Sequence, residues 1–232
     1  MFKRTCLLVF ISAATTACAA VAQAPEGPPP PPIPGAPPAL PGRPGLVAGA
    51  FVPTTVNGTV KSYLLNPGGQ VDGLLLADGK QLHFPPHMGA ALRQAARPGD
   101  SIQATVEMGN QSVYGRECRT ISLTNPKTGA TVVDQPPLSP PSPPVPGQAV
   151  TAKGTIARWL VGHMGEVNGF LLSDGTQVHF PPHLGFALNQ QVKVGDAVAA
   201  QGYGTRTDFG TSLDLAAMTV NGKSLSMFGS QP

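Results

Sequence analysis

Histidines in a repeated pentapeptide are the residues of this chain whose type and spacing suggest chemistry. The segment HFPPH occurs at His83–His87 and again at His179–His183, and it contains four of the five histidines. Imidazole is a ligand for zinc, copper or nickel. One pentapeptide is not expected to chelate an ion, because its two prolines exclude the i, i+4 helical arrangement. An extended path separates its histidines by about 12 Å.

A metal site shared between the two copies is one hypothesis for these residues. Its zinc or copper ligands would be His83, His87, His179 and His183, brought together by face-to-face packing of the copies. The alternative is structural. Period-two alternation places His83 and His179 on the polar face of a strand. His87 and His183 stand just before a helix and would accept a hydrogen bond from a free helix N–H. No other cofactor is expected.

The pentapeptide belongs to a longer duplication. Residues 58–100 align without a gap onto residues 154–196, and about half of the positions are identical. Each copy predicts three strands, a short helix and two further strands. An Asp-Gly pair, with both residues at positive φ, is expected to join strands two and three. The apolar helix face is predicted to comprise Met88, Ala91, Leu92 and Ala95 in copy one and Leu184, Ala187 and Leu188 in copy two.

This element order predicts an all-β fold with one short helix per unit, built as two tandem OB-fold-like, five-stranded Greek-key barrels. The expected organisation is a signal peptide at 1–22, a proline-rich disordered linker at 23–50, repeat 1 at 51–134, a second proline-rich linker at 135–148 and repeat 2 at 149–232. Proline-rich runs favour extended spacers.

A family resemblance rests on the phrase DG…HFPPH…GD, which both copies contain. Through it the units resemble uncharacterised secreted bacterial OB-fold proteins. The resemblance covers both repeats and neither linker. It implies the fold and carries no activity or catalytic residue.

On such a barrel, strands two and three and the loop between strands four and five are the customary binding regions. The candidate ligand-binding residues in these regions are Tyr63, Gln81, His83, Tyr114 and Arg116 in copy one, and Trp159, Gln177, His179, Tyr203 and Arg206 in copy two. Tyr63 and Trp159 hold equivalent positions. They would either stack on a base or sugar ring or plug the mouth of the barrel.

The N-terminus has the three-part pattern of a secretory signal. Lys3 and Arg4 precede an apolar run, and small residues precede an expected cleavage before Gln23. Cys18 offers a rival ending as a lipidated cysteine. The chain is therefore expected to be exported to the periplasm or cell envelope, with an outer-membrane lipoprotein as the variant form and that lipid as its one membrane attachment.

Enzymatic activity is not expected. Beyond the signal the chain keeps a single cysteine, Cys118, which cannot form an internal disulfide and is expected to be structural. No serine or cysteine has a base at a recognisable spacing. The formal net charge of +3 gives no broad basic surface for nucleic acid.

The leading hypothesis is thus a non-enzymatic, exported cell-envelope binding module. Its partner would be an envelope protein, a glycan or a small molecule. A periplasmic metal-binding protein that uses the repeat histidines is the first alternative. A single-stranded nucleic-acid binder is the second, by fold analogy alone, and nucleic acid is not an expected partner.

Overall fold

The computed structural model of the chain describes residues 52–138, 140 and 147–225. The predicted signal peptide, Cys18 and the first linker lie outside the described residues, and so does half of the second linker. No helix in the described ranges is long and apolar enough to cross a membrane.

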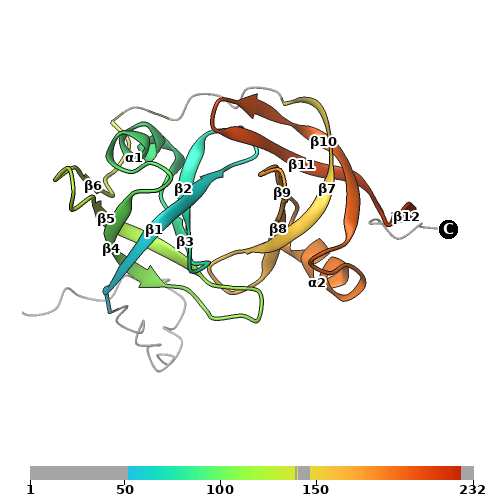
Figure 1. Cartoon of the computed structure of the whole chain (residues 1–232), viewed down its shortest axis with the longest axis horizontal. Helices are drawn as coiled ribbons and strands as arrows, with labels where there is room; N and C mark the ends of the chain where they lie inside the picture. The colour runs from blue at the N-terminus through green and yellow to red at the C-terminus, as the bar shows by residue number, and fades with distance from the viewer. Residues whose placement is uncertain (1–51, 139, 141–146, 226–232) are drawn as a thin grey trace, which may run out of the picture. The chain divides into compact units, whose positions relative to one another are not determined.

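The first repeat folds into a five-stranded barrel (Figure 1). Its strands are β1 (Thr54–Leu65), β2 (Val71–Leu76), β3 (Gln81–His83), β4 (Ser101–Met108) and β5 (Glu117–Thr124). The sheet order is β3-β2-β1-β4-β5, and a parallel pairing of β3 with β5 closes it. A short strand, β6 (Thr131–Val133), extends the sheet beyond β5. Between β3 and β4 lie η1 (Pro86–Met88) and α1 (Gly89–Ala95).

The second repeat has the same design. Its strands are β7 (Gln148–Val161), β8 (Val167–Leu172), β9 (Gln177–His179), β10 (Ala197–Thr207) and β11 (Gly210–Val220), with β12 (Lys223–Leu225) at the edge. Helix α2 (Pro182–Gln191) lies between β9 and β10. Parallel pairing of β9 with β11 and antiparallel pairing of β10 with β11 close the barrel. The predicted fold class, two OB-like barrels with one short helical segment each, is confirmed.

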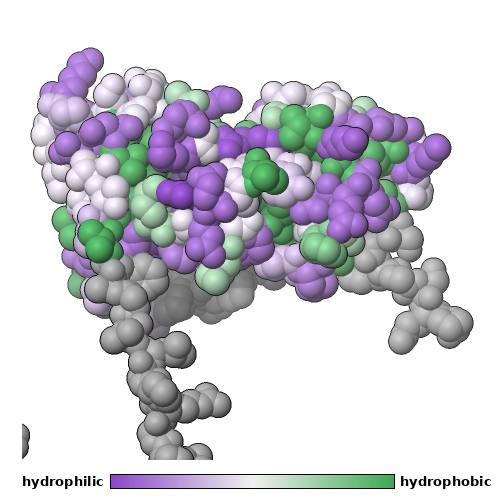
Figure 2. Space-filling model, turned by 90° about the horizontal axis from the view of Figure 1, so that it is seen from below, coloured by the Kyte–Doolittle hydropathy of each residue, from purple (hydrophilic) through white to green (hydrophobic). Residues whose placement is uncertain are grey.

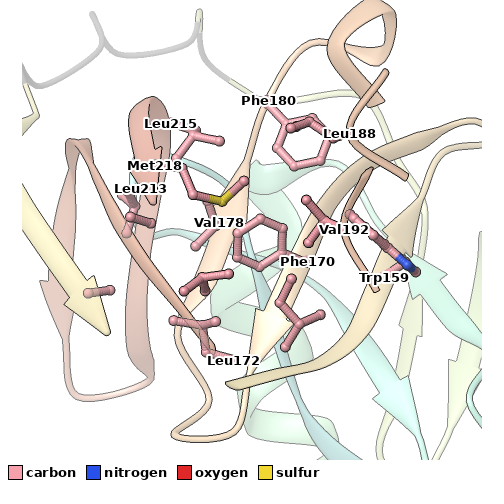
Figure 3. Packing of buried hydrophobic residues seen from close by; sticks show 14 of the residues in the cluster. Trp159, Phe170, Leu172, Val178, Phe180, Leu188, Val192, Leu213, Leu215 and Met218 are labelled. Carbon is pink, nitrogen blue, oxygen red and sulfur yellow. The ribbon is translucent and has the colours of Figure 1, made fainter. Parts of the chain in front are cut away.

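Each barrel encloses its own apolar core. Strand β4 buries Ile102, Ala104 and Val106 on one face, as the period-two pattern predicts. In the second barrel the Phe170 ring lies at the centre of the core (Figure 3). Its ring centroid lies 6.0 Å from that of Trp159 and 6.0 Å from that of Phe180. Because the strands contribute alternate apolar residues to a closed interior, each barrel is stabilised by packing without a disulfide.

The helix face differs from its prediction in one respect. Met88, Leu92 and Ala95 are buried as expected, but Ala91 is exposed and Gly89 is buried in its place. A Cβ atom on Gly89 would lie 2.1 Å from the Val71 carbonyl oxygen.

Helix α2 repeats this arrangement. Gly185 is buried, and a Cβ atom there would lie 1.9 Å from the Val167 carbonyl oxygen, whereas Ala187 is exposed. Each helix therefore approaches strand two of its barrel through glycine, at a distance that a side chain would prevent.

The Asp-Gly turns also differ from the prediction. Only Gly79 (φ 94°) and Gly175 (φ 89°) have positive φ, and the preceding aspartates do not. The Gly79 N–H donates to the Leu76 carbonyl oxygen, so the residues before the glycine form the turn and the glycine follows it in the left-handed region. The Asp78 carboxylate accepts a hydrogen bond from the Lys80 N–H at 3.1 Å, which explains the aspartate.

Candidate functional site

The two barrels belong to one compact unit of the chain and pack against each other through equivalent surfaces. A small apolar cluster lies between them, formed by Leu64 and Leu75 of the first barrel and Leu160 and Leu171 of the second. Leu64 and Leu160 are equivalent in the repeat alignment, as are Leu75 and Leu171. The contact is therefore pseudo-symmetric, with each barrel presenting strands one and two.

Two glutamines cap the main chain of the opposite barrel. Gln177 Oε1 accepts a hydrogen bond from the Leu65 N–H at 2.9 Å, and Gln177 Nε2 donates to the Tyr63 carbonyl oxygen at 3.0 Å. Gln81 Oε1 reciprocally accepts from the Val161 N–H at 3.4 Å. Gln81 and Gln177 are 1% and 2% exposed. The face of strands two and three that carries them was predicted to be open to solvent, but at these residues the opposite barrel covers it.

The equivalent aromatics Tyr63 and Trp159 pack inward. Tyr63 donates its hydroxyl proton to the Ala96 carbonyl oxygen at 3.1 Å, and its ring meets the edge of Phe209 at 5.9 Å. Trp159 is 4% exposed and meets Tyr114 at 6.0 Å. Phe209 and Tyr114 each come from the loop between strands four and five of the opposite barrel. Neither Tyr63 nor Trp159 is an exposed stacking platform, since each ring meets an aromatic ring of the opposite barrel.

The remaining loop candidates do not form one site. Arg116 is half-buried in the first barrel, and its Nε has no hydrogen-bond partner among the described residues. Tyr203 is 64% exposed on β10. Arg206 is exposed and donates to the Thr151 carbonyl oxygen at 3.2 Å. On the face drawn in Figure 2, polar residues predominate and apolar residues stand in small groups.

A cavity of about 150 Å³ lies where the barrels meet. Its wall consists mainly of equivalent residues from the two repeats: Leu64 and Leu160, Asp72 and Asn168, Gln81 and Gln177, His83 and His179. The first histidine of each HFPPH segment therefore reaches the same cavity. Period-two alternation placed both histidines on the polar face of strand three, and that face lines the cavity.

Sequence reasoning missed the Asp72 and Asn168 pair. Each stands one position before the strand-two glycine that is paired with the cavity histidine of its own barrel, Gly73 with His83 and Gly169 with His179. The signal was a polar residue within an otherwise apolar strand.

Burial determines the charge of the cavity. Desolvation, and secondarily the charge of His179, lowers the pKa of His83 to about 4, and desolvation lowers the pKa of His179 to about 4. Desolvation raises the pKa of Asp72 to about 7. Both imidazoles are therefore neutral at neutral pH.

A second carboxyl lies beside the cavity histidines. Glu117 Oε2 lies 3.8 Å from His83 Nε2. Desolvation raises the pKa of Glu117 to about 7, and the charges of Glu166 and Asp72 add to that rise. In mildly acidic solution Asp72 and Glu117 are therefore protonated and neutral.

The second histidine of each pentapeptide lies elsewhere. His87 is exposed in η1, and its Nε2 lies 2.7 Å from the Gln135 carbonyl oxygen instead of capping the helix. His183 is exposed in the first turn of α2. The four histidines are therefore not gathered in one place. Within the described ranges, no group of three or more His, Cys, Asp or Glu is arranged to hold a metal ion.

Cys118 lies apart from this chemistry. It is fully buried in the first core, with its Sγ 3.6 Å from Met108 Sδ. Desolvation raises the pKa of its thiol, which disfavours the reactive thiolate. This environment agrees with the structural role expected from sequence.

Comparison with known proteins leaves the family open. No protein-family model matches the chain, and no curated protein matches it. Two crystal structures of the single-stranded DNA binding protein from Thermus aquaticus, the wild type and a deletion mutant, are similar to it at 13% sequence identity and a TM-score of 0.24. They cover 77% of this chain and 97% and 96% of theirs. At that TM-score the likeness carries no argument, and the fold assignment rests on strand pairing.

Proposed function

We propose that this chain is a non-enzymatic, exported cell-envelope binding protein whose ligand occupies the cavity between its two barrels. The N-terminal signal pattern supports export. The pairing of equivalent polar residues from both repeats supports a site that the duplication created. In this proposal the partner is a small molecule, because a cavity of about 150 Å³ matches a small molecule in size better than a glycan chain or a protein surface.

One observation carries the proposal. Asp72 Oδ1, Gln81 Nε2 and His179 Nε2 are buried beside the cavity without a hydrogen-bond partner in the described part of the chain, although the Leu65 main chain lies close enough to the His179 ring to raise its pKa. Buried polar atoms in folded proteins nearly always have a partner, and leaving one unpaired costs about 1–3 kcal/mol. A cavity whose wall presents such atoms is suited to a molecule that supplies the missing hydrogen bonds.

A matched pair of histidine variants tests this function. Thermal unfolding of the full chain would be followed with and without a size-fractionated small-molecule pool from cell envelopes. The wild type and His183→Leu, which alters an exposed histidine, are expected to gain thermal stability from the pool. His179→Leu is expected to gain none while keeping a folded circular-dichroism spectrum. Equal gains in all three proteins, or no gain in the wild type, would contradict a ligand site in the cavity.

A metal-binding function is the second candidate, and the shared cavity of His83 and His179 is what favours it. Neutral imidazoles need not lose a proton before they bind zinc or copper. Histidine side-chain ¹⁵N spectra of the metal-stripped chain would be recorded during zinc and then copper addition. Stoichiometric shifts of His83 and His179, with His87 and His183 unchanged, would favour a metal; weak, independent shifts would count against it.

Single-stranded nucleic acid remains a proposal by fold analogy alone. Tyr63, Tyr114 and Trp159 pack against aromatic rings of the opposite barrel, and Gln81 and Gln177 are buried, which leaves these five side chains unavailable to bases in this arrangement; Tyr203 is exposed. Retention of the full chain on a single-stranded polynucleotide column at physiological salt would restore this candidate.

A further inference from the structure

The chemical class of the cavity ligand can be argued from its wall, and this step rests on the proposed function. Neither barrel forms the cavity by itself, because equivalent residues of both repeats line it. Its volume of about 150 Å³ corresponds to roughly five water molecules at about 30 Å³ each. A ligand that fills it is therefore a small molecule with few non-hydrogen atoms.

The polar atoms of the cavity wall are best matched by a ligand that both donates and accepts hydrogen bonds. The Asp72 carboxyl accepts through Oδ1, and it also donates when protonated. His179 Nε2 either accepts or donates, according to the ring tautomer. An amide or hydroxyl group satisfies both atoms in either tautomer, whereas a simple ion satisfies only one kind of partner. Gln177 is unavailable because both ends of its amide already bind the opposite main chain.

The charge of the surroundings argues against ions of either sign. No lysine or arginine lines the cavity, and the Glu117 carboxyl beside it interacts with the charges of Asp72 and Glu166. An anion would therefore enter without a positively charged partner. A metal cation would lack a three-group ligand set in the described ranges. Burial keeps both imidazoles neutral, and any cation would have to pair with a carboxyl whose raised pKa shows that its own buried charge is disfavoured.

The rest of the wall is apolar. Leu64 and Leu160 lie in equivalent positions and belong to the cluster between the barrels. Hydrocarbon placed against them is removed from water. We propose that the inter-barrel cavity binds a small uncharged molecule that carries an amide or hydroxyl group on a short hydrocarbon frame.

Three size-matched compounds test the class: propionamide, propionate and propylammonium. Each would be titrated into the full chain at about pH 6, where Asp72 is mainly protonated. Histidine ring and asparagine side-chain ¹⁵N signals would report binding. Propionamide is expected to shift the His179 and Asn168 signals with a Kd about tenfold or more below that of either ion. The signals of His87 and His183 are expected to stay in place.

The variants and outcomes separate this inference from the function on which it rests. His179→Leu should abolish the propionamide shift at Asn168, and His183→Leu should preserve it. Tighter cavity binding by an ion would overturn the uncharged class and leave the binding function standing. No cavity shift with any of the three compounds would also overturn the class, and the envelope-pool experiment would then decide the function independently.

Discussion

Replacing Asp72 with asparagine tests the desolvation of the inter-barrel cavity. The chain contains its own precedent, because the equivalent position of the second barrel is Asn168 and lines the same cavity. The exchange keeps the shape of the side chain and removes its ability to ionise. Any change that depends on pH between the two proteins therefore reports the Asp72 carboxyl.

The magnitude follows from the pKa of that carboxyl. Burial raises it from 3.8 to about 7, and each unit corresponds to about 1.4 kcal/mol. The folded state holds the Asp72 proton more tightly than the unfolded state, so its contribution to stability is greatest below about pH 4 and falls until about pH 7. Asp72→Asn should therefore change the free energy of unfolding little at about pH 4 and raise it by up to about 4 kcal/mol at about pH 8.

Urea unfolding followed by circular dichroism would measure this difference at several pH values. Asn168→Asp is the reverse control, and it should introduce a loss of stability as the pH rises. Parallel pH profiles for the wild type and Asp72→Asn would refute the reasoning, since they would mean that Asp72 is as well solvated in the folded chain as in the unfolded chain.

Four further predictions concern other parts of the chain. Burial lowers the pKa of His179 to about 4, so the protein should lose stability as the pH falls from about 6.5 to 4. His179→Gln should remove roughly 3 kcal/mol of that loss in acid unfolding titrations. An acid unfolding profile unchanged by the substitution would count against the burial of His179. Gly185→Ala should destabilise by about 1–3 kcal/mol in urea unfolding despite a better helix propensity, because its Cβ would clash with a strand carbonyl; stabilisation would disprove the close approach. Gln177→Ala should cost about 2–3 kcal/mol in the same assay, because it leaves a buried N–H and a carbonyl unpaired; a neutral effect would mean that the barrels separate readily. Mass spectrometry of the exported chain should find an N-terminus at Gln23, and a mass that begins at lipidated Cys18 would establish the lipoprotein alternative.

The order of the elements along the chain and the buried face of β4 could be predicted because their signals are local. Alternation along β4 marks its buried face, and the gap-free repeat places the same elements twice. Ala91 was wrongly predicted to be buried on the helix face because glycine has no side chain and so does not count as apolar in a periodic pattern. Gly89 is buried through its main chain, which approaches the Val71 carbonyl without a side chain between them.

The closure of the binding face could not be predicted in the same way. Alternation tells which side of a strand a residue occupies, but not what lies opposite that side. Gln81 and Gln177 were placed on the correct face, where they cap main-chain groups of the other barrel. Those groups are distant in sequence, and only the packing of the repeats brings them together.

The same limit applies to the histidines. His83 and His87 carry identical side chains a few positions apart, yet His83 is half-buried in the wall of the cavity and His87 is exposed beside a carbonyl. The pentapeptide therefore contains two different environments, and a motif made of residue types could not distinguish them.

Joining the two barrels in one chain has a consequence for the centre of their contact. Two separate identical subunits meeting through this pseudo-symmetric contact would place the same side chain on both sides, so every substitution there would appear twice. Covalent fusion releases that constraint. In this chain a carboxyl, Asp72, and a carboxamide, Asn168, line the same cavity, so a single proton can be gained or lost where a symmetric dimer would hold two acids. The duplication thereby turns a self-complementary surface into one whose two sides can carry different residues and different charges.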